Sequence, residues 1–245
     1  MPRAGSMWAF NVTRTALYDL GRKVMPERIP QSEKEMFALS RRAIEDKNPD
    51  SVYVFKVHEP VSPDTPDSLI ILPRRDLRDA IISYMRFTRR DFERGLAGAK
   101  LWRQSYDYYA VFPENQVLRL AYETIRDTPV DGLLAISEFL NLDLDGESIS
   151  RICEMFSKDN VKKLIRNTEN KVNDDIERYG RVSGEHLVKN LDGSYRAFDV
   201  ATGFQSRHIS EYRDGDWRRL LTKEQIHRMH EALGDWLLAN GYPMD

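Results

Sequence analysis

The chain has 245 residues, of which 41% are hydrophobic and 31% charged, and its 37 basic and 39 acidic side chains leave a net charge of −2. This length suits one large α/β domain with a substantial core. The balanced charge is that of an ordinary soluble globular protein and argues against bulk binding of nucleic acid.

Cysteine content and hydropathy indicate the cellular compartment. Cys153 is the only cysteine, so the chain can form neither an intrachain disulfide nor a multi-cysteine zinc site, and we expect a reducing compartment. No stretch of about eighteen apolar residues could span a bilayer, and the first residues lack the layout of a signal peptide. We therefore expect a cytoplasmic protein with no membrane span.

Strands and helices are predicted to alternate over the first two thirds of the chain. Helical spacing of apolar residues predicts helices over Trp8–Arg22, Lys34–Asp46, Asp79–Phe87, Asp91–Ala110, Val130–Leu140 and Ile149–Phe156, with Ser6 as the cap of the first. β-branched and apolar runs predict strands over Ser51–Lys56, Ser68–Leu72 and Gln116–Ala121, the first two of them buried and parallel. This order predicts an α/β protein with a parallel sheet flanked by helices, in a single domain over residues 1–245.

The last third of the chain is less regular. Residues 167–214 are polar, charged and glycine-bearing without a clear period, which predicts a lid, a binding loop or a disordered segment. Residues Lys223–Ala239 form the last predicted helix, whose apolar stripe is expected to face the core: Ile226, Met229, Leu233, Trp236 and Leu237.

The first residues, Pro2 to Trp8, form a basic, glycine-containing turn that leads directly into the first helix. The unpaired N–H groups and the dipole of a helix N-terminus favour an anion there. Gly5 permits close approach of the backbone, Ser6 offers a hydroxyl and Arg3 offers a forked cation. The turn is therefore a candidate phosphate site, although a plain helix cap is the simpler interpretation.

Other candidate groups follow the predicted strands. Lys56 and His58 end the first of these strands with their side chains on one face, and ligands of open α/β sheets bind at such strand ends. A lone histidine is otherwise more often structural or merely exposed. Arg75, at the end of the second strand, and Ser83, in the next helix, could donate to a second phosphate, or they belong to an ordinary charged loop and helix. Tyr122 follows the third strand and could meet a nucleobase.

In this order the segments resemble those of a sulfotransferase that uses 3′-phosphoadenosine 5′-phosphosulfate (PAPS). Residues 2–8 resemble the 5′-phosphosulfate loop of that family, and residues 56–60 resemble its Lys-Thr-His-x-Pro segment. Residues 75–84 resemble its 3′-phosphate segment, and residues 122–129 resemble its Tyr-Glu-x-x-x-x-x-Pro segment. Residues 215–217 match its Gly-Asp-Trp. The resemblance covers nearly the whole chain and implies a P-loop-like parallel sheet flanked by helices.

The resemblance implies a role for each matching residue. The 5′ side of the nucleotide would be held by Arg3, Ala4, Gly5, Ser6, Met7 and Trp8, the last also near adenine. Arg75 and Ser83 would hold the 3′-phosphate, and Tyr122 would contact adenine. Lys56 and His58 would face the transferring sulfuryl group, with His58 as the catalytic base.

The implied reaction moves a sulfuryl group from PAPS to a hydroxyl or amine of a small-molecule, carbohydrate or lipid acceptor. The products are the sulfated acceptor and 3′-phosphoadenosine 5′-phosphate (PAP), and no metal is required. Such a transfer asks the protein for positioning and for cations around the moving charge. Arg3 and Lys56 would stabilise the leaving oxygen, while His58 would remove the acceptor proton.

Some residues depart from the family pattern. Arg3 stands where the cytosolic branch has lysine, and Met7 replaces a threonine. The usual basic loop ahead of Gly215 is absent, which leaves Arg207 and His208 as candidate substitutes for its grip on the 3′-phosphate. The strand that the family places before the opening loop is missing from the sequence, and we expect a truncated start.

Two other functions stay open at this point. One is an ATP-dependent P-loop kinase or NTPase, although the loop lacks the Gly-x-x-x-x-Gly-Lys-Ser/Thr pattern and its Mg²⁺-binding hydroxyl. The other is a non-catalytic nucleotide-binding module that keeps the fold without turnover. In each case residues 25–50 and 167–214 are expected to line the side opposite the nucleotide, where an acceptor would bind.

Overall fold

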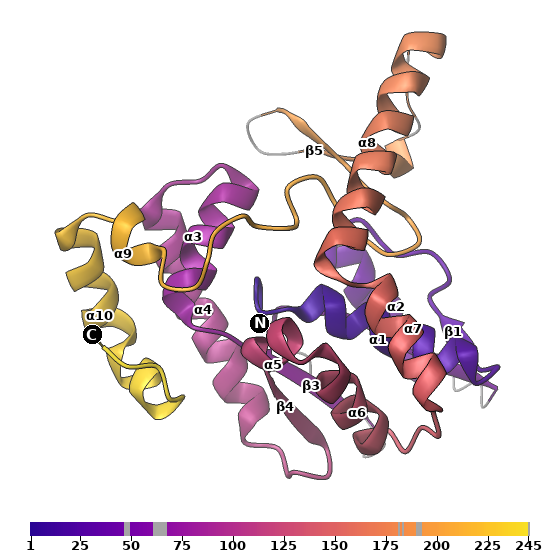
Figure 1. Cartoon of the computed structure of the whole chain (residues 1–245), viewed down its shortest axis with the longest axis horizontal. Coiled ribbons are helices and arrows are strands. Elements are labelled where there is room, and N and C mark those ends of the chain that lie inside the picture. The colour runs from indigo at the N-terminus through magenta and orange to yellow at the C-terminus, as the bar shows by residue number, and fades with distance from the viewer. Residues whose placement is uncertain (47–49, 61–67, 181, 183, 190–192, 245) are drawn as a thin grey trace.

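The computed structural model describes residues 1–46, 50–60, 68–180, 182, 184–189 and 193–244, with the arrangement shown in Figure 1. The strands are β1 (Lys23–Met25), β2 (Ser51–Tyr53), β3 (Ile70–Arg74), β4 (Val117–Ala121), β5 (Leu187–Lys189) and β6 (Tyr195–Ala197). The helices are α1 (Ser6–Asp19), α2 (Glu33–Asp46), α3 (Leu77–Thr88), α4 (Phe92–Ala110), α5 (Tyr122–Asp127), α6 (Pro129–Phe139), α7 (Gly146–Met155), α8 (Lys158–Tyr179), α9 (Trp217–Leu220) and α10 (Lys223–Ala239), with a 3-10 turn at Gly184–His186.

The strands associate in three pairs. β1 lies parallel to β2 and β3 lies parallel to β4, whereas β5 and β6 form an antiparallel hairpin. In the second pair the register runs from Ile70 opposite Val117 to Arg74 opposite Ala121, and α1, α4 and α6 pack against these strands. The predicted α/β fold with parallel strands and flanking helices is confirmed, with the parallel strands in two separate pairs in the described part of the chain.

Most predicted elements are confirmed within a few residues. The last helix, α10, spans the predicted residues, and Thr222 and Gln225 cap its start reciprocally. The predicted strand from Ser51 is shorter than expected, because β2 ends at Tyr53, and its residues are half-buried rather than buried. β1, α5 and α9 were not predicted, since segments of 3, 6 and 4 residues are too short to show a hydrophobic period.

The predicted cap of the first helix is wrong. Gly5, and not Ser6, is the N-cap residue of α1, with a φ of 84° in the left-handed region and no side-chain hydrogen bond. Ser6 is already the first helical residue. The carbonyl of Gly5 accepts the first helical hydrogen bond, from the N–H of Ala9 at 3.0 Å. The glycine therefore sets the entry of the chain into α1 by its backbone conformation.

The prediction of an irregular segment over residues 167–214 is wrong for its first part. Helix α8 continues to Tyr179, begins at the capping side chain of Ser157 and ends before Gly180, whose φ is 65°. Its buried residues form one narrow stripe on an otherwise polar surface: Val161, Ile165 and Val172. So few apolar positions give a weak helical period, which is why the sequence pattern missed this helix.

Three apolar clusters form the core. The first joins β3, α3, α4 and α10, and its fully buried members include Ile81 and Leu233. The second joins α1, α6, α7 and α8, with Trp8 packed in it. The third is smaller and lies between α1, α2 and the residues after β6; its buried members are Phe10, Ile29, Met36 and Phe198.

A buried ion pair connects α3 to the C-terminal helices. Arg78 is 1% exposed and donates through Nε and Nη2 to the carboxylate of Asp76 at 2.7–3.1 Å. Its guanidinium lies 4.4 Å from the centroid of the Trp217 ring, at the start of α9. The pair thus holds the residues just after β3 against the polypeptide that leads into α10.

We expect Arg78→Met to lower the free energy of unfolding by about 3–5 kcal/mol, because it leaves the Asp76 carboxylate buried without its partner. The double variant Asp76→Asn/Arg78→Met should recover part of this loss. Urea unfolding measures both, with Arg94→Met on the exposed side of α4 as control. A double variant no more stable than Arg78→Met alone would contradict this account of the pair.

Candidate anion-binding site

The opening loop is held against α5 by a close glycine contact. A Cβ on Gly5 would lie 2.7 Å from Cδ1 of Ile125 and 3.4 Å from Cδ2 of Tyr122, so a larger residue cannot occupy this position without displacement. Ala4, the residue before it, is fully buried. The loop therefore lies at the carboxyl end of β4, where the sequence predicted Tyr122 and the loop to share one ligand.

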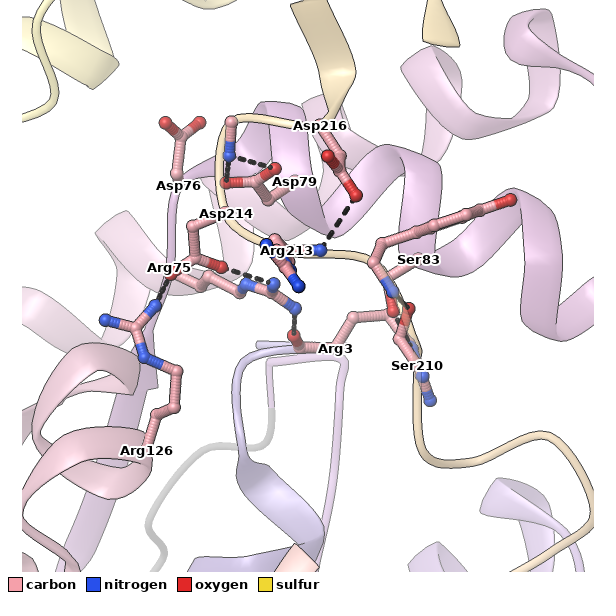
Figure 2. Close-up of polar contacts among 12 residues, drawn as sticks. Arg3, Arg75, Asp76, Asp79, Ser83, Arg126, Ser210, Arg213, Asp214 and Asp216 are labelled. Carbon is pink, nitrogen blue, oxygen red and sulfur yellow. Dashed lines mark hydrogen bonds and ion pairs between the residues drawn. The ribbon is translucent and has the colours of Figure 1, made fainter. Parts of the chain in front are cut away.

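Arg3 is the meeting point of three distant segments. Its Nε donates to Oγ of Ser83 at 3.0 Å, and its Nη2 donates to the carbonyl of His208 at 2.7 Å. Its own carbonyl accepts from Nη1 of Arg75 at 3.2 Å. Figure 2 shows Arg3, Arg75 and Ser83 together, with the contact between Arg75 and the carbonyl of Arg3 as a dashed line. Arg3, Arg75 and Ser83, which the sequence assigned to two ends of a nucleotide, are thus in direct contact.

Arg75 is buried, and most of its guanidinium is already engaged. Its Nη2 donates to Oδ1 of Asp214 at 2.9 Å, and Asp214 also pairs with Arg126, so one carboxylate bridges two arginines (Figure 2). The guanidinium lies 4.0 Å from the centroid of the Tyr122 ring. Its Nε is buried, and within the described residues it has no hydrogen-bond partner. That nitrogen is available to an oxyanion.

Lys56 and His58 lie together on the segment after β2. The predicted shared face is confirmed, since Nζ of Lys56 is 3.4 Å from Nε2 of His58. The strand itself ends three residues before Lys56, at Tyr53, so the pair belongs to the connection and not to the strand. Lys56 and His58 both act electrostatically on His208, as Arg3 does, so this pair lies near Arg3.

His208 is a neutral ring within a group of cations. Gln205 donates its N–H to Nδ1 at 2.9 Å, which leaves the proton of the neutral imidazole on Nε2. Burial, followed by the charges of Arg3 and Lys56, lowers the pKa of His208 well below its ordinary value. Its neighbour Arg207 has a left-handed φ of 66°. The sequence analysis named Arg207 and His208 as candidate contacts of the 3′-phosphate. In the structure the carbonyl of His208 accepts a hydrogen bond from Arg3.

The surroundings of Arg3 disfavour its positive charge. Burial first, and the nearby charge of Arg75 second, lower the pKa of Arg3 to about 9, with further contributions from Arg86 and Arg196. The guanidinium still carries its charge at pH 7. A bound anion would relieve both the desolvation and the repulsion, so this arrangement favours an anionic ligand.

The turn before α9 completes the site. The carboxylate of Asp79 accepts from the N–H of Gly215 at 3.0 and 3.1 Å, and Asp216 accepts from the N–H of Arg213 at 2.8 Å. Gly215 has a φ of 85°, which a glycine adopts readily. These bonds fix the position of Asp214, and through it the guanidinium of Arg75.

Several residues of the site were not identified from the sequence. Phe87 lies one helical turn after Ser83, and its helical spacing could have revealed it. Arg126 occupies a variable position of the 122–129 segment and Asp214 directly precedes residues 215–217, whereas Arg196 lies outside every motif. Only the fold brings these three residues here. The described residues contain no group of three or more histidine, cysteine or acidic side chains that could hold a metal ion. None of the described helices is long and apolar enough to cross a membrane.

Together the fold and the site define an α/β protein that presents a nucleotide-sized set of cations at the carboxyl ends of its parallel strands. The sequence model of the sulfotransferase domain family matches residues 21–241, so the chain belongs to the sulfotransferase family. The opening loop lies outside the matched residues. No protein of curated function has a matching sequence.

Solved structures support the same fold. The structure of mouse sulfotransferase SULT7A1 complexed with PAP is 15% identical, with a TM-score of 0.64 over 97% of this chain and 81% of the other. Retinol dehydratase in complex with androsterone and inactive cofactor PAP is 16% identical, with a TM-score of 0.54 over 96% and 78%. Its complex with retinol and PAP gives a TM-score of 0.57 at the same identity and coverage. The resemblance to the sulfotransferase fold is thereby confirmed.

Asp79 should make folding stability depend on pH. Burial raises the pKa of its carboxyl from 3.8 to about 6, against the opposing hydrogen bond from Gly215. The folded protein then binds this proton more tightly than the unfolded chain. The stability contribution is complete below the unfolded pKa and is lost as pH rises through about 6.

We therefore expect the free energy of unfolding of the wild type, minus that of Asp79→Asn, to fall between pH 4 and pH 7. Denaturant unfolding at several pH values measures this difference. Asp131→Asn, at an exposed position of α6, is the matched control. Parallel curves for the wild type and Asp79→Asn would show that Asp79 does not titrate in this range.

Proposed function

We propose that the chain transfers a sulfuryl group from PAPS to a hydroxyl or amine of an acceptor molecule and releases PAP. Membership of the sulfotransferase family sets the reaction class. The observation that carries the proposal for this chain is the contact of Arg3 with Ser83, which unites the opening loop and the middle of α3 in one cationic site. The neighbours complexed with PAP add support at the level of the fold.

The residues present fit a doubly phosphorylated adenosine. Gly5 packs closely against Ile125 and so holds the loop in place, and the backbone N–H groups of Ser6 and Met7, which open α1, would face the 5′ side. Arg75, through its buried Nε, and Ser83 would bind the 3′-phosphate. Tyr122, at the carboxyl end of β4, would meet adenine. These positions agree with those that the resemblance assigns.

Arg3 has to exchange partners when the nucleotide binds. In the structure its guanidinium holds Oγ of Ser83, and we propose that it turns to the phosphosulfate and leaves this hydroxyl to the 3′-phosphate. Ala4 and Trp8 would contribute through their place in the loop, since both side chains are buried. Arg207 and His208 would stand where the family's third contact with the 3′-phosphate lies. The carbonyl of His208 accepts a hydrogen bond from Arg3.

The chemistry follows from the charges. The bond between sulfur and the bridging oxygen of the donor breaks while a bond from sulfur to the acceptor oxygen or nitrogen forms. His58 would accept the proton that the acceptor loses, and Lys56, 3.4 Å away, would lie on the side of the moving sulfuryl group. Arg3 and Lys56 would stabilise the negative charge that grows on the leaving oxygen.

Other features of the proposal concern the whole chain. We infer that residues 1–245 act as one sulfotransferase domain and that the described parts of residues 25–50 and 167–214 lie on the acceptor side. We also place the protein in the cytoplasm, because its single cysteine, Cys153, is a free thiol.

His58→Ala should lower turnover by at least about 10²-fold, because the variant lacks the base, and should leave the affinity for PAP nearly unchanged. Transfer of labelled sulfate from PAPS to the first acceptor found in a panel of phenols, alcohols and sugars measures turnover, and calorimetry measures PAP binding. His227→Ala, at an exposed position of α10, is the matched control. Unchanged transfer by the His58 variant would remove this residue from the mechanism.

Ser83→Ala should weaken PAP binding by about tenfold or more, because it removes a hydrogen bond to a charged phosphate. Ser105→Ala is the matched control, since Ser105 is equally buried but lies in α4. The affinity of the wild type for PAP should be the same with and without a chelator. Binding of ATP that requires magnesium, in place of PAP binding, would favour the kinase alternative.

A further inference from the structure

The ring of His208 is held in one orientation by its own loop and by two aromatic rings. The N–H of Gln205 donates to Nδ1 of the ring at 2.9 Å, and the N–H of His208 donates back to the carbonyl of Gln205 at 3.0 Å. The ring stacks on Phe87 with centroids 4.8 Å apart and meets Phe204 edge to face with centroids 5.7 Å apart. Phe204 is buried in the second apolar cluster. These contacts fix the direction in which the imidazole points.

The other nitrogen of this ring is a free hydrogen-bond donor. Because Nδ1 accepts from Gln205, the proton of the neutral imidazole lies on Nε2. None of the described residues accepts a hydrogen bond from this N–H. Burial and the nearby cations lower the pKa of His208 well below its ordinary value, so the ring stays neutral. A polar group left without a partner in such a place is unfavourable, and a ligand oxygen would relieve this.

The ring lies away from the expected place of the 3′-phosphate. Arg75, which would bind that phosphate with Ser83, precedes the first residue of α3. Phe87, on which the ring of His208 stacks, follows Ser83 by one turn and lies about 6 Å farther along the helix axis. The imidazole is therefore displaced along α3, away from Arg75.

The groups around His208 are those of the reacting end of the donor. The carbonyl of His208 accepts from Nη2 of Arg3 at 2.7 Å, and Lys56 and His58 both act electrostatically on its ring. In the proposed reaction Arg3 and Lys56 stabilise the leaving oxygen, and His58 receives the proton of the acceptor. The group that these three residues share is the sulfuryl group. The free N–H of His208 thus lies on the side of the sulfuryl group.

We propose that the Nε2–H of His208 donates a hydrogen bond to a sulfonate oxygen of PAPS. The inference rests on the proposed function, and it revises for this ring the 3′-phosphate contact that the resemblance implies. The bond adds a donor at the sulfonate without adding positive charge beside Arg3. Since PAP has no sulfonate, the bond exists only with the donor. His208 would therefore favour binding of PAPS over its product.

The variant His208→Phe tests this contact, because it keeps a ring that can stack on Phe87 but has no N–H. We expect its affinity for PAPS to fall about tenfold or more and its affinity for PAP to stay within about twofold of the wild type. Equilibrium dialysis of radiolabelled PAPS, without an acceptor, measures the first affinity, and calorimetry with PAP measures the second. His227→Phe, at an exposed position of α10, is the matched control.

The variant His208→Gln separates the N–H from the bond within the loop. Like the phenylalanine variant, it loses the acceptor at Nδ1, but its side-chain amide can place an N–H near the position of Nε2. We expect it to recover most of the PAPS affinity that His208→Phe loses. A glutamine variant as weak as the phenylalanine variant would assign the loss to the bond with Gln205 and overturn the inference.

Two further results would also overturn it. Equal weakening of PAPS and PAP binding in His208→Phe would place the ring at the 3′-phosphate or give it a purely structural role. Unchanged PAPS affinity in that variant would show that the N–H does not contact the donor. A wild-type protein that binds neither nucleotide contradicts the proposed function itself, so the two failures are distinguishable.

Discussion

The site depends on one buried cation, the guanidinium of Arg3, and on what surrounds it. Its hydrogen bonds join the opening loop, the middle of α3 and the residues before α9, which are otherwise far apart in the chain. The contact with Ser83 keeps this charge near Arg75, and burial with that repulsion lowers the pKa of Arg3 to about 9. Because burial and repulsion both disfavour this positive charge, the site favours a ligand that carries negative charge, such as a phosphate or sulfate group.

The acidic side chains of the site serve a different purpose from the basic ones. Asp214 bridges Arg75 and Arg126, and Asp79 holds the turn that carries Asp214. Asp76 is paired with Arg78, away from the Arg3 contact in Figure 2. These carboxylates fix the framework. The framework then presents arginine and lysine side chains to the ligand, which is the division expected where phosphate and sulfate groups bind.

The sequence predicts what local pattern determines. The period of apolar residues located α10 and most other helices. Three short motifs located Arg3, Lys56, His58, Arg75 and Ser83, and the structure confirms the proximity of the pairs that are in contact: Arg3 with Ser83, Arg3 with Arg75, and Lys56 with His58. Helix α8 escaped because so narrow an apolar stripe carries little periodic signal. The sequence analysis missed Asp214 and Arg196 for another reason. Each acts across the fold on a residue more than a hundred positions away, which no local pattern encodes.

Phe87 explains how several basic groups can share so small a space. Two guanidiniums near one another repel strongly where water is scarce. The Phe87 ring offers each of Arg3 and Arg196 its negative π-electron face, an interaction worth about 0.5–2 kcal/mol per pair. His208 stacks on the same ring in its neutral form and adds no charge. The aromatic ring thus lets the opening loop and the β5–β6 hairpin each bring a guanidinium to the same side chain of α3.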